Sequence, residues 1–439
     1  QSASLAQSGL QRLFAMDSST LVTPSRCPAT LRWCSSSRGQ DRCSLRRGLR
    51  LERPQHLAQA MFFGFCASFT ARLQQKQLGQ KRRIARIRRF NEIATGQPMR
   101  KLLRPETRIA HAPMLLRSDQ LQLCSGISEL LDCYDAFTLD QYGVLHNGRE
   151  AYPGAAECVA QMKAAGKPCV ILSNYAGRAE RQKEKLPDIG FDPDDLAGVV
   201  TSGELAHSYL SRQGKLGTRV LWIAWSEREK RGLGDFFEGL EDYTLVSKVE
   251  DADFILVSGV ESRFAGTEAE ETCDYERTGT ERLYRPLFRA AIQRTLPMIC
   301  ANPDLRVIRP GGWKAYLGGS LALYYERLGG QVIYFGKPYS SAFEEARRQL
   351  CRAVAGNEEE ALQLEVDEDF RICHVGDSLQ HDVRGALSVG FHALFVGRTG
   401  LHADDMGGPD APLTKDGVRD LCVREKVPLP QAAIPRFQW

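Results

Sequence analysis

Four short polar motifs follow apolar runs in this chain, and each carries a group suited to chemistry on an anion. They supply a carboxylate, a hydroxyl with an amide, a cation and an acidic pair: Asp140, Ser173 with Asn174, Lys337, and Asp377 with Asp382. A carboxylate at the end of a buried strand, just before a glycine turn, is where an α/β enzyme keeps a nucleophile. Two aspartates five residues apart across a strand-to-helix turn offer the hard oxygen ligands that suit Mg²⁺.

Each motif has an ordinary structural explanation when it is taken alone. A serine at a strand end, such as Ser173, is most often a turn former. A single lysine such as Lys337 is usually solvated, and Asp382 alone fits a helix N-cap better than a metal site. The four motifs together, in this order and each at a strand end, are much more specific than any one of them.

The elements that must position these groups alternate between strand and helix from about residue 125 onward. We expect strands at 136–140, 168–173, 198–202, 219–224, 253–258, 297–301, 332–335, 371–375 and 392–396. Helical patterns fill most gaps, at 155–165, 283–294, 341–354 and 382–389. Such alternation predicts an α/β fold with a mostly parallel sheet and helices on both faces. Ligands then bind at the carboxyl ends of the strands, where the four motifs fall.

The combined motifs resemble those of the haloacid dehalogenase (HAD) superfamily. The similar segments are Asp140–Gly148, Tyr152–Ala155, Leu172–Asn174, Val200–Glu204, Cys300–Asp304 and Gly336–Pro338. They look like class IIA, the p-nitrophenylphosphatase-like members with a C2-type cap, and like an uncharacterised branch with a tyrosine two residues after the nucleophile. The resemblance covers residues 120–439 and implies a Rossmann-like core with an inserted α/β cap. The expected domains are an extension, a first core segment, the cap and a second core segment, at 1–115, 116–205, 206–315 and 316–439.

The resemblance also implies a role for each candidate residue. Asp140 would attack phosphorus to form an aspartyl phosphate, while Ser173 and Lys337 hold the phosphoryl oxygens. The Mg²⁺ ligands would be Asp140, the main-chain carbonyl of Tyr142 and Asp377, with Asp382 as a further or supporting carboxylate. Substrate contacts are expected from Tyr142, Ser173, Asn174, Lys337, Asn302 and Asp304.

Tyr142 departs from the pattern of the phosphatases that the chain resembles. Those enzymes have an aspartate at this position, which acts as general acid and base. A phenol with a pKa of about 10 is a poor general base at neutral pH. General acid catalysis contributes about 10²- to 10⁴-fold, so ordinary phosphomonoesters should turn over slowly. His146 is the nearest substitute, and an exposed loop histidine is the competing interpretation. Binding of Mg²⁺ should persist, since a carbonyl is the ligand at position 142.

Three functions remain open from the sequence. The first is a Mg²⁺-dependent hydrolase, a phosphatase acting on a small phosphorylated metabolite. The second is a catalytically impaired protein that binds a phosphometabolite. The third is a 2-haloacid dehalogenase-type hydrolase, because an aspartate followed at the second position by tyrosine and then glycine is also similar to that branch. Against the third stands the acidic pair, since displacement of a halide needs no divalent metal.

The N-terminal extension is strongly basic. Residues 1–110 contain 21 Lys and Arg against 5 Asp and Glu. An arginine- and serine-rich, acid-poor N-terminus is typical of a transit peptide or a disordered segment, with a short basic helix over Lys81–Phe90. We therefore expect a cytoplasmic protein, or a mitochondrial or plastid one if the extension is a transit peptide. No nucleic-acid partner is expected, because aromatic residues do not alternate with the arginines of this cluster as they do where bases stack.

Other sequence features limit the expected partners, oligomeric state and compartment of the protein. The longest apolar run in the extension, Met61–Ala67, is too short for a membrane helix, which needs about 18 residues, so no membrane partner is expected. Thirteen scattered cysteines without a CxxC pair indicate a reducing compartment. Trp222, Trp225 and Trp313 are expected in the core, and the segment 261–284 as an exposed cap loop. Class IIA proteins often pair through their caps, so a homodimer is one expected state.

Overall fold

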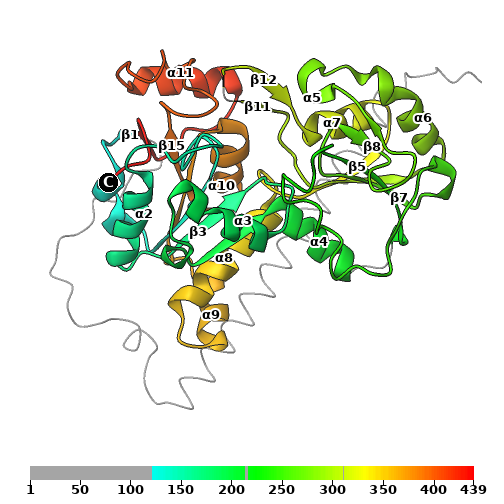
Figure 1. Cartoon of the computed structure of the whole chain (residues 1–439). Coiled ribbons are helices and arrows are strands. Elements are labelled where there is room, and N and C mark those ends of the chain that lie inside the picture. The colour runs from blue at the N-terminus through cyan, green and yellow to red at the C-terminus, as the bar shows by residue number, and fades with distance from the viewer. Residues whose placement is uncertain (1–120, 213–215, 310) are drawn as a thin grey trace, which may run out of the picture. The chain divides into compact units, whose positions relative to one another are not determined.

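All nine apolar runs predicted as strands are strands in the computed structural model, which describes residues 121–212, 216–309 and 311–439 (Figure 1). They divide between two sheets. The first, the core sheet, has the order β1-β16-β15-β14-β2-β3-β4 with every neighbouring pair parallel. Its strands are β1 (Gln122–Leu123), β2 (Ala136–Leu139), β3 (Cys169–Ser173), β4 (Gly198–Thr201), β14 (Ile372–Gly376), β15 (His392–Val396) and β16 (Ala432–Ile434).

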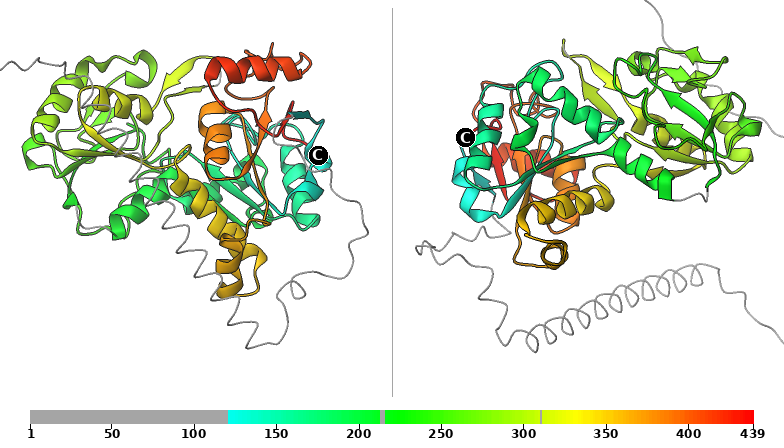
Figure 2. Two further views of the ribbon diagram at one scale, coloured as in Figure 1. Left: turned by 180° about the vertical axis from the view of Figure 1, so that it is seen from behind. Right: turned by 60° about the horizontal axis from the view of Figure 1, so that its bottom comes forward.

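The core sheet is covered on both faces, which explains why its central strands are apolar without alternation. All residues of β2, β3 and β14 are buried. One face packs against α2 (Ala155–Ala164). The other packs against α8 (Ser340–Val354), α9 (Glu358–Glu365), α10 (Arg384–Ser388) and α11 (Lys415–Glu425), which Figure 2 shows from two further sides. Helix α3 (Ala179–Lys185) lies beside β4.

The second sheet, the cap sheet, has the order β13-β10-β7-β5-β8-β9, with β6 pairing to β5. Its strands are β5 (Arg219–Ala224), β6 (Thr244–Leu245), β7 (Phe254–Val257), β8 (Ser262–Arg263), β9 (Glu271–Thr272), β10 (Pro297–Cys300) and β13 (Gln331–Tyr334). Residues of α4 (Ser202–Arg212), α6 (Arg285–Gln293) and α7 (Gly318–Arg327) complete its apolar core. A separate antiparallel hairpin is formed by β11 (Arg306–Ile308) and β12 (Lys314–Tyr316).

Short helices connect these elements. The 3-10 turns are η2 (Ile127–Glu129), η3 (Leu131–Cys133), η4 (Pro187–Ile189), η5 (Pro193–Asp195), η7 (Val249–Asp251) and η8 (Glu281–Leu283). One α-helical turn is α5 (Tyr275–Thr278), and a π-helical turn, η9 (Leu379–Val383), precedes α10. The predicted helix at 382–389 therefore begins within η9 and continues as α10.

The predicted end of the cap at residue 315 is wrong. Strand β13 pairs in parallel with β10 through four residues, and α7 packs its apolar side chains into the cap core. The cap sheet therefore extends to Tyr334, and the core resumes with α8. The sequence signal was ambiguous here because a βαβ unit looks alike whichever sheet receives its second strand.

The segment 261–284 is also not an exposed loop, because Tyr275 and Tyr284 are buried in the cap core. Trp222 and Trp225 are buried as expected, whereas Trp313 is partly exposed. Predictions on the N-terminal extension, residues 1–115, fall outside the described residues. Within the described ranges no helix has the length and apolarity to cross a bilayer.

Candidate active site

The carboxyl ends of strands from both sheets meet around one cavity of about 320 Å³. Core strands β2, β3 and β14 and cap strands β10 and β13 end there. All nine residues predicted for the site line it: Asp140, Tyr142, Ser173, Asn174, Asn302, Asp304, Lys337, Asp377 and Asp382. The volume lies in the range of small-molecule sites, about 300–1,000 Å³.

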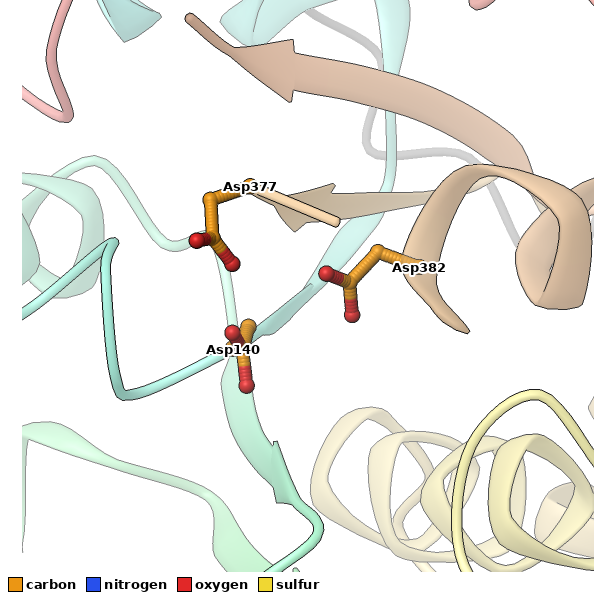
Figure 3. Close-up of side chains that lie close together, drawn as sticks. All are labelled: Asp140, Asp377 and Asp382. Carbon is orange, nitrogen blue, oxygen red and sulfur yellow. The ribbon is translucent and has the colours of Figure 1, made fainter. Parts of the chain in front are cut away.

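Three carboxylates converge at the core end of this cavity (Figure 3). Asp140, Asp377 and Asp382 are all buried, and one oxygen from each lies within 4.8 Å of the others. Asp140 directly follows β2, Asp377 directly follows β14, and Asp382 lies in η9. Three like charges this close repel one another strongly unless cations or protons offset them.

Lys337 supplies one of those cations. Its ammonium group lies 2.5 Å from Asp140 Oδ1 and 2.7 Å from Asp382 Oδ1, and its side chain is 3% exposed. Burial alone would lower the pKa of Lys337, but Asp140 and Asp382 outweigh it and raise that pKa. Burial raises the pKa of Asp140 to about 6, in spite of Lys337. The lysine therefore stays charged, and Asp140 is mostly ionised at neutral pH.

Asp382 is held by a buried hydrogen-bond network that the sequence did not reveal. Its Oδ1 atom lies 2.9 Å from His374 Nε2, and His374 Nδ1 lies 2.8 Å from Thr138 Oγ1. Burial lowers the pKa of His374, which favours the neutral ring. A polar residue in the middle of each buried strand, Thr138 in β2 and His374 in β14, was the available signal.

The N-cap interpretation of Asp382 is wrong, because Ser378 caps η9 by accepting from the His381 amide. Asp382 Oδ2 instead accepts a hydrogen bond from the Ser378 amide at 2.9 Å. Burial opposes ionisation of Asp382, yet Lys337 and His374 hold its pKa below the ordinary value. Both of its oxygens thus have protein partners, and it orients the Lys337 ammonium.

Asp377 differs from its neighbours because it has no ion pair with any described residue. The Leu401 amide donates to its Oδ2 atom at 2.6 Å. Burial and the adjacent Asp140 raise its pKa well above the ordinary value. Gly143 permits this packing: its φ is +91°, and a Cβ there would lie 2.3 Å from Asp377 Oδ2.

Ser173 ends β3 and Asn174 follows it, and the two side chains serve different purposes. The Ser173 hydroxyl accepts from the Tyr175 amide at 3.2 Å, so the predicted turn is present and the hydroxyl hydrogen is left to donate. Asn174 accepts from the Lys337 amide at 2.7 Å and donates to the Lys337 carbonyl at 3.1 Å. Its second hydrogen is donated to Asp304 at 2.7 Å. Both amide hydrogens of Asn174 are therefore used within the protein, one on the Lys337 main chain and one on Asp304.

The loop after β10 connects the cap to this network. Asp304 Oδ1 lies 3.0 Å from His381 Nδ1 as well as accepting from Asn174. Burial opposes protonation of His381, but Asp304 raises its pKa. Asn302 Oδ1 accepts from the Asp304 amide at 3.1 Å and so shapes the loop. This loop follows strand β10 of the cap sheet, and the chain stays in the cap until β13 ends.

Tyr142 is tied to the cap hairpin. Its hydroxyl donates to the carbonyl of Ile308 in β11. Burial raises the pKa of Tyr142 further above the ordinary value for a phenol. A hydroxyl that is neutral and already donating to a carbonyl is poorly suited to act as a general base.

His146 lies beside Tyr142, with the two ring centres 6.1 Å apart, and it lines the cavity. Its Nδ1 atom accepts from the Gly148 amide at 3.0 Å, whereas its buried Nε2 has no partner among the described residues. Burial lowers the pKa of His146 to about 4. The ring is therefore neutral at pH 7, with Nε2 carrying the hydrogen, and the expectation of an exposed loop histidine is wrong.

Two family models match the chain at the segments that build this site. Residues 137–233 match a haloacid dehalogenase-like hydrolase model, and residues 334–420 match a HAD-hydrolase-like model. Both segments thus have the sequence of haloacid dehalogenase-like hydrolases. The gap between the two matches, 234–333, is made of cap residues, as expected for a cap inserted between the second and third motifs of class IIA.

Similar proteins support this assignment. The 5'-nucleotidase YutF of Bacillus subtilis is 24% identical over 63% of this chain and 93% of its own length. An acid sugar phosphatase of Staphylococcus epidermidis is 23% identical over 64% of this chain and 93% of its length.

Solved structures agree on the fold. A haloacid dehalogenase-like family hydrolase from Brucella suis has a TM-score of 0.54 at 26% identity and covers 72% of this chain and 100% of its own. A possible sugar phosphatase from Cytophaga hutchinsonii has a TM-score of 0.53 at 19% identity, with 72% and 98% covered. The predicted superfamily, its capped α/β fold and its hydrolase class are thus confirmed.

Proposed function

We propose that this HAD hydrolase is a Mg²⁺-dependent phosphatase acting on a small phosphorylated metabolite through an aspartyl phosphate on Asp140. The observation that carries the proposal is the convergence of Asp140, Lys337 and the carboxylate of Asp377 at the closed end of one cavity. The names of the curated relatives, a 5'-nucleotidase and an acid sugar phosphatase, support a small phosphorylated substrate.

The charges fit a divalent cation. Three buried carboxylates face one another, Lys337 offsets one negative charge, and Asp377 has no cation among the described residues. The ligands would be Asp140, Asp377 and the main-chain carbonyl of Tyr142. Asp382 would support the site, because its oxygens are taken by Lys337, His374 and the Ser378 amide. When bound, Mg²⁺ would offset the negative charge of the carboxylates and of the phosphoryl group.

The chain's own residues then divide the work. The carboxylate of Asp140 attacks phosphorus, the bond to the leaving oxygen breaks, and water later attacks the aspartyl phosphate to release inorganic phosphate. Lys337 lowers the repulsion between Asp140 and the incoming anion. The Ser173 hydroxyl, whose hydrogen is not used in its turn, donates to a phosphoryl oxygen.

A second candidate is a phosphometabolite-binding protein with little catalysis, and two observations favour it. The Tyr142 hydroxyl is committed to Ile308, and the pKa of His146 is lowered to about 4. Neither side chain is a good proton donor to a leaving alkoxide. The phosphatase should therefore prefer leaving groups that need little protonation, such as phenolates or acyl phosphates.

The test is turnover by the full-length chain with and without Mg²⁺. We expect hydrolysis of p-nitrophenyl phosphate and acetyl phosphate only with Mg²⁺, and none from Asp140→Asn. Turnover that persists in chelator would contradict the proposal. Phosphorylated ligands that raise the melting temperature without any product over long incubation would favour the binding protein. Chloride release from 2-chloropropionate, without phosphate release from esters, would favour the dehalogenase.

A further inference from the structure

The cap side of the cavity carries a cluster of cations that the proposed chemistry does not use. Arg231, Arg306 and Arg309 all line it. The one cap carboxylate that lines the cavity, Asp304, is already paired with His381. Phosphoryl transfer at Asp140 employs Lys337, which leaves the three arginines of the lining for contact with another part of a substrate.

Arg309 is anchored by hydrogen bonds to one glutamate of the cap. Its Nε and Nη2 atoms donate to Glu276 Oε1 at 3.0 and 2.7 Å. Glu276 is 8% exposed and is absent from the cavity lining. A guanidinium has five N–H donors, so this anchoring leaves three for a ligand.

Arg231 is fixed through its main chain and its ring contact. Its carbonyl accepts from Lys185 Nζ at 3.0 Å and from the Tyr175 hydroxyl. Its guanidinium lies 4.0 Å from the centre of the Trp225 ring, while its nearest carboxylate atoms, on Glu261 and Glu276, are 3.6 and 3.9 Å away. These long contacts are weaker than the hydrogen-bonded pair that anchors Arg309.

Arg306 is the most open of the three. It is exposed, and no carboxylate of the described residues lies within ion-pair distance of it. Its guanidinium lies over the Tyr316 ring at 4.6 Å and donates to the Tyr316 hydroxyl at 3.3 Å. Tyr316 belongs to β12, which pairs with the strand that carries Arg306, so the hairpin itself supports this cation.

The same wall offers no platform for stacking a base. Trp225 is 6% exposed, and Arg231 and Arg309 lie 4.0 and 5.7 Å from its ring centre. An aromatic residue needs an accessible face to stack on a nucleobase. The chemistry of this wall therefore favours an anion over an aromatic ring.

We infer that Arg231, Arg306 and Arg309 form a second anion-binding subsite, so that the preferred substrate is a phosphomonoester with another anionic group at its far end. The inference deepens the proposed function and rests on it. A carboxylate and a second phosphate share the chemistry that planar guanidinium groups recognise. The substrate class is thus a sugar-acid phosphate or a bisphosphate.

Matched substrates test the subsite in the full chain. 6-Phosphogluconate against glucose 6-phosphate isolates a carboxylate, and fructose 1,6-bisphosphate against fructose 6-phosphate isolates a second phosphate. We expect kcat/KM to favour at least one member with a second anionic group about 10-fold or more, the effect of one hydrogen bond to a charged group. Arg306→Gln and Arg309→Lys should each reduce that ratio about 10-fold. Arg289→Gln, an exposed cap arginine outside the cavity, should leave the ratio unchanged.

Binding separates failure of the subsite from failure of the proposed function. Calorimetry on Asp140→Asn measures the affinity for the same pairs without turnover. If no ester is hydrolysed by wild type but Asp140→Asn binds the member with the second anionic group more tightly, and Arg306→Gln removes the preference, the phosphatase proposal fails and the subsite stands. Equal affinity for both members of each pair, or an equal loss for both in Arg306→Gln, would overturn the subsite.

Discussion

Replacing Tyr142 with aspartate should increase turnover of alkyl phosphates. The substitution removes the hydroxyl that donates to the Ile308 carbonyl and places a carboxylate at the position from which a proton must reach the leaving oxygen. Two effects of opposite sign follow, and their sizes decide the outcome.

The loss is the smaller effect. One neutral hydrogen bond contributes about 1 kcal/mol net, which corresponds to about 5-fold in the equilibrium constant for docking of the cap hairpin. A general acid contributes about 10²- to 10⁴-fold to the chemical step. The new carboxylate also adds negative charge beside Asp140 and Asp377. Burial already disfavours the ionised form of both of these side chains. Bound Mg²⁺ offsets that cost, so the expected net gain in kcat is at least about 10-fold with Mg²⁺ present.

The assay is steady-state hydrolysis of an alkyl phosphate and of p-nitrophenyl phosphate at saturating Mg²⁺. Tyr142→Phe is the matched control, because it removes the same hydrogen bond without adding an acid. We expect Tyr142→Asp to gain on the alkyl ester and to change little on the phenolate ester. If Tyr142→Asp binds Mg²⁺ as wild type does and is no faster than Tyr142→Phe on the alkyl ester, the reasoning about proton transfer is refuted.

Three further predictions concern the charged site. Lys337→Met should lower the free energy of unfolding of the metal-free protein by about 3–5 kcal/mol, because two buried carboxylates lose their cation. Urea titrations measure this change. A loss below about 1 kcal/mol would mean that water solvates the two carboxylates. Gly143→Ala should weaken Mg²⁺ binding in calorimetry, since its Cβ would displace Asp377, whereas Gly390→Ala, where a Cβ meets nothing within 4 Å, should not. Because burial raises the pKa of Asp140 to about 6 in the metal-free protein, its contribution to stability is present below the ordinary pKa of about 4 and is lost as the pH rises through 6. Mg²⁺ should therefore raise Tm more at about pH 8 than at about pH 5, and an equal shift would contradict this assignment.

The sequence predicted the core sheet and the clustering of the candidate site residues because both depend on local patterns. Each strand was an apolar run of the right length, and Asp140, Ser173 and Asp377 each followed one. Parallel strands bring their carboxyl ends to one edge, so sequence position alone placed these groups together.

What the sequence did not predict depends on contacts between distant segments. Thr138 and His374 are 236 residues apart, and nothing local indicates that they share a hydrogen bond behind Asp382. The C-terminal boundary of the cap was predicted wrongly for the same reason. The sequence does not show whether β13 pairs with a strand of the core sheet or with β10 of the cap sheet. The family resemblance implied a substrate contact for Asn174, and it could not show that the amide hydrogens of this residue are donated to Lys337 and Asp304.

Tyr142 and the arginine cluster bear on the same property of the site, the docking of the cap. The Tyr142 hydroxyl reaches the main chain of Ile308, and the adjacent hairpin residues Arg306 and Arg309 line the cavity. Removing that hydroxyl would therefore change the position of the arginines relative to a substrate. It would also change the chemistry at the leaving group. If the second anion binds as inferred, Tyr142→Phe should weaken the binding of substrates with a second anionic group more than that of p-nitrophenyl phosphate. An aspartate at this position could supply a proton to the leaving group but could not replace the hydroxyl's contact with the Ile308 carbonyl at neutral pH, because a carboxylate only accepts hydrogen bonds.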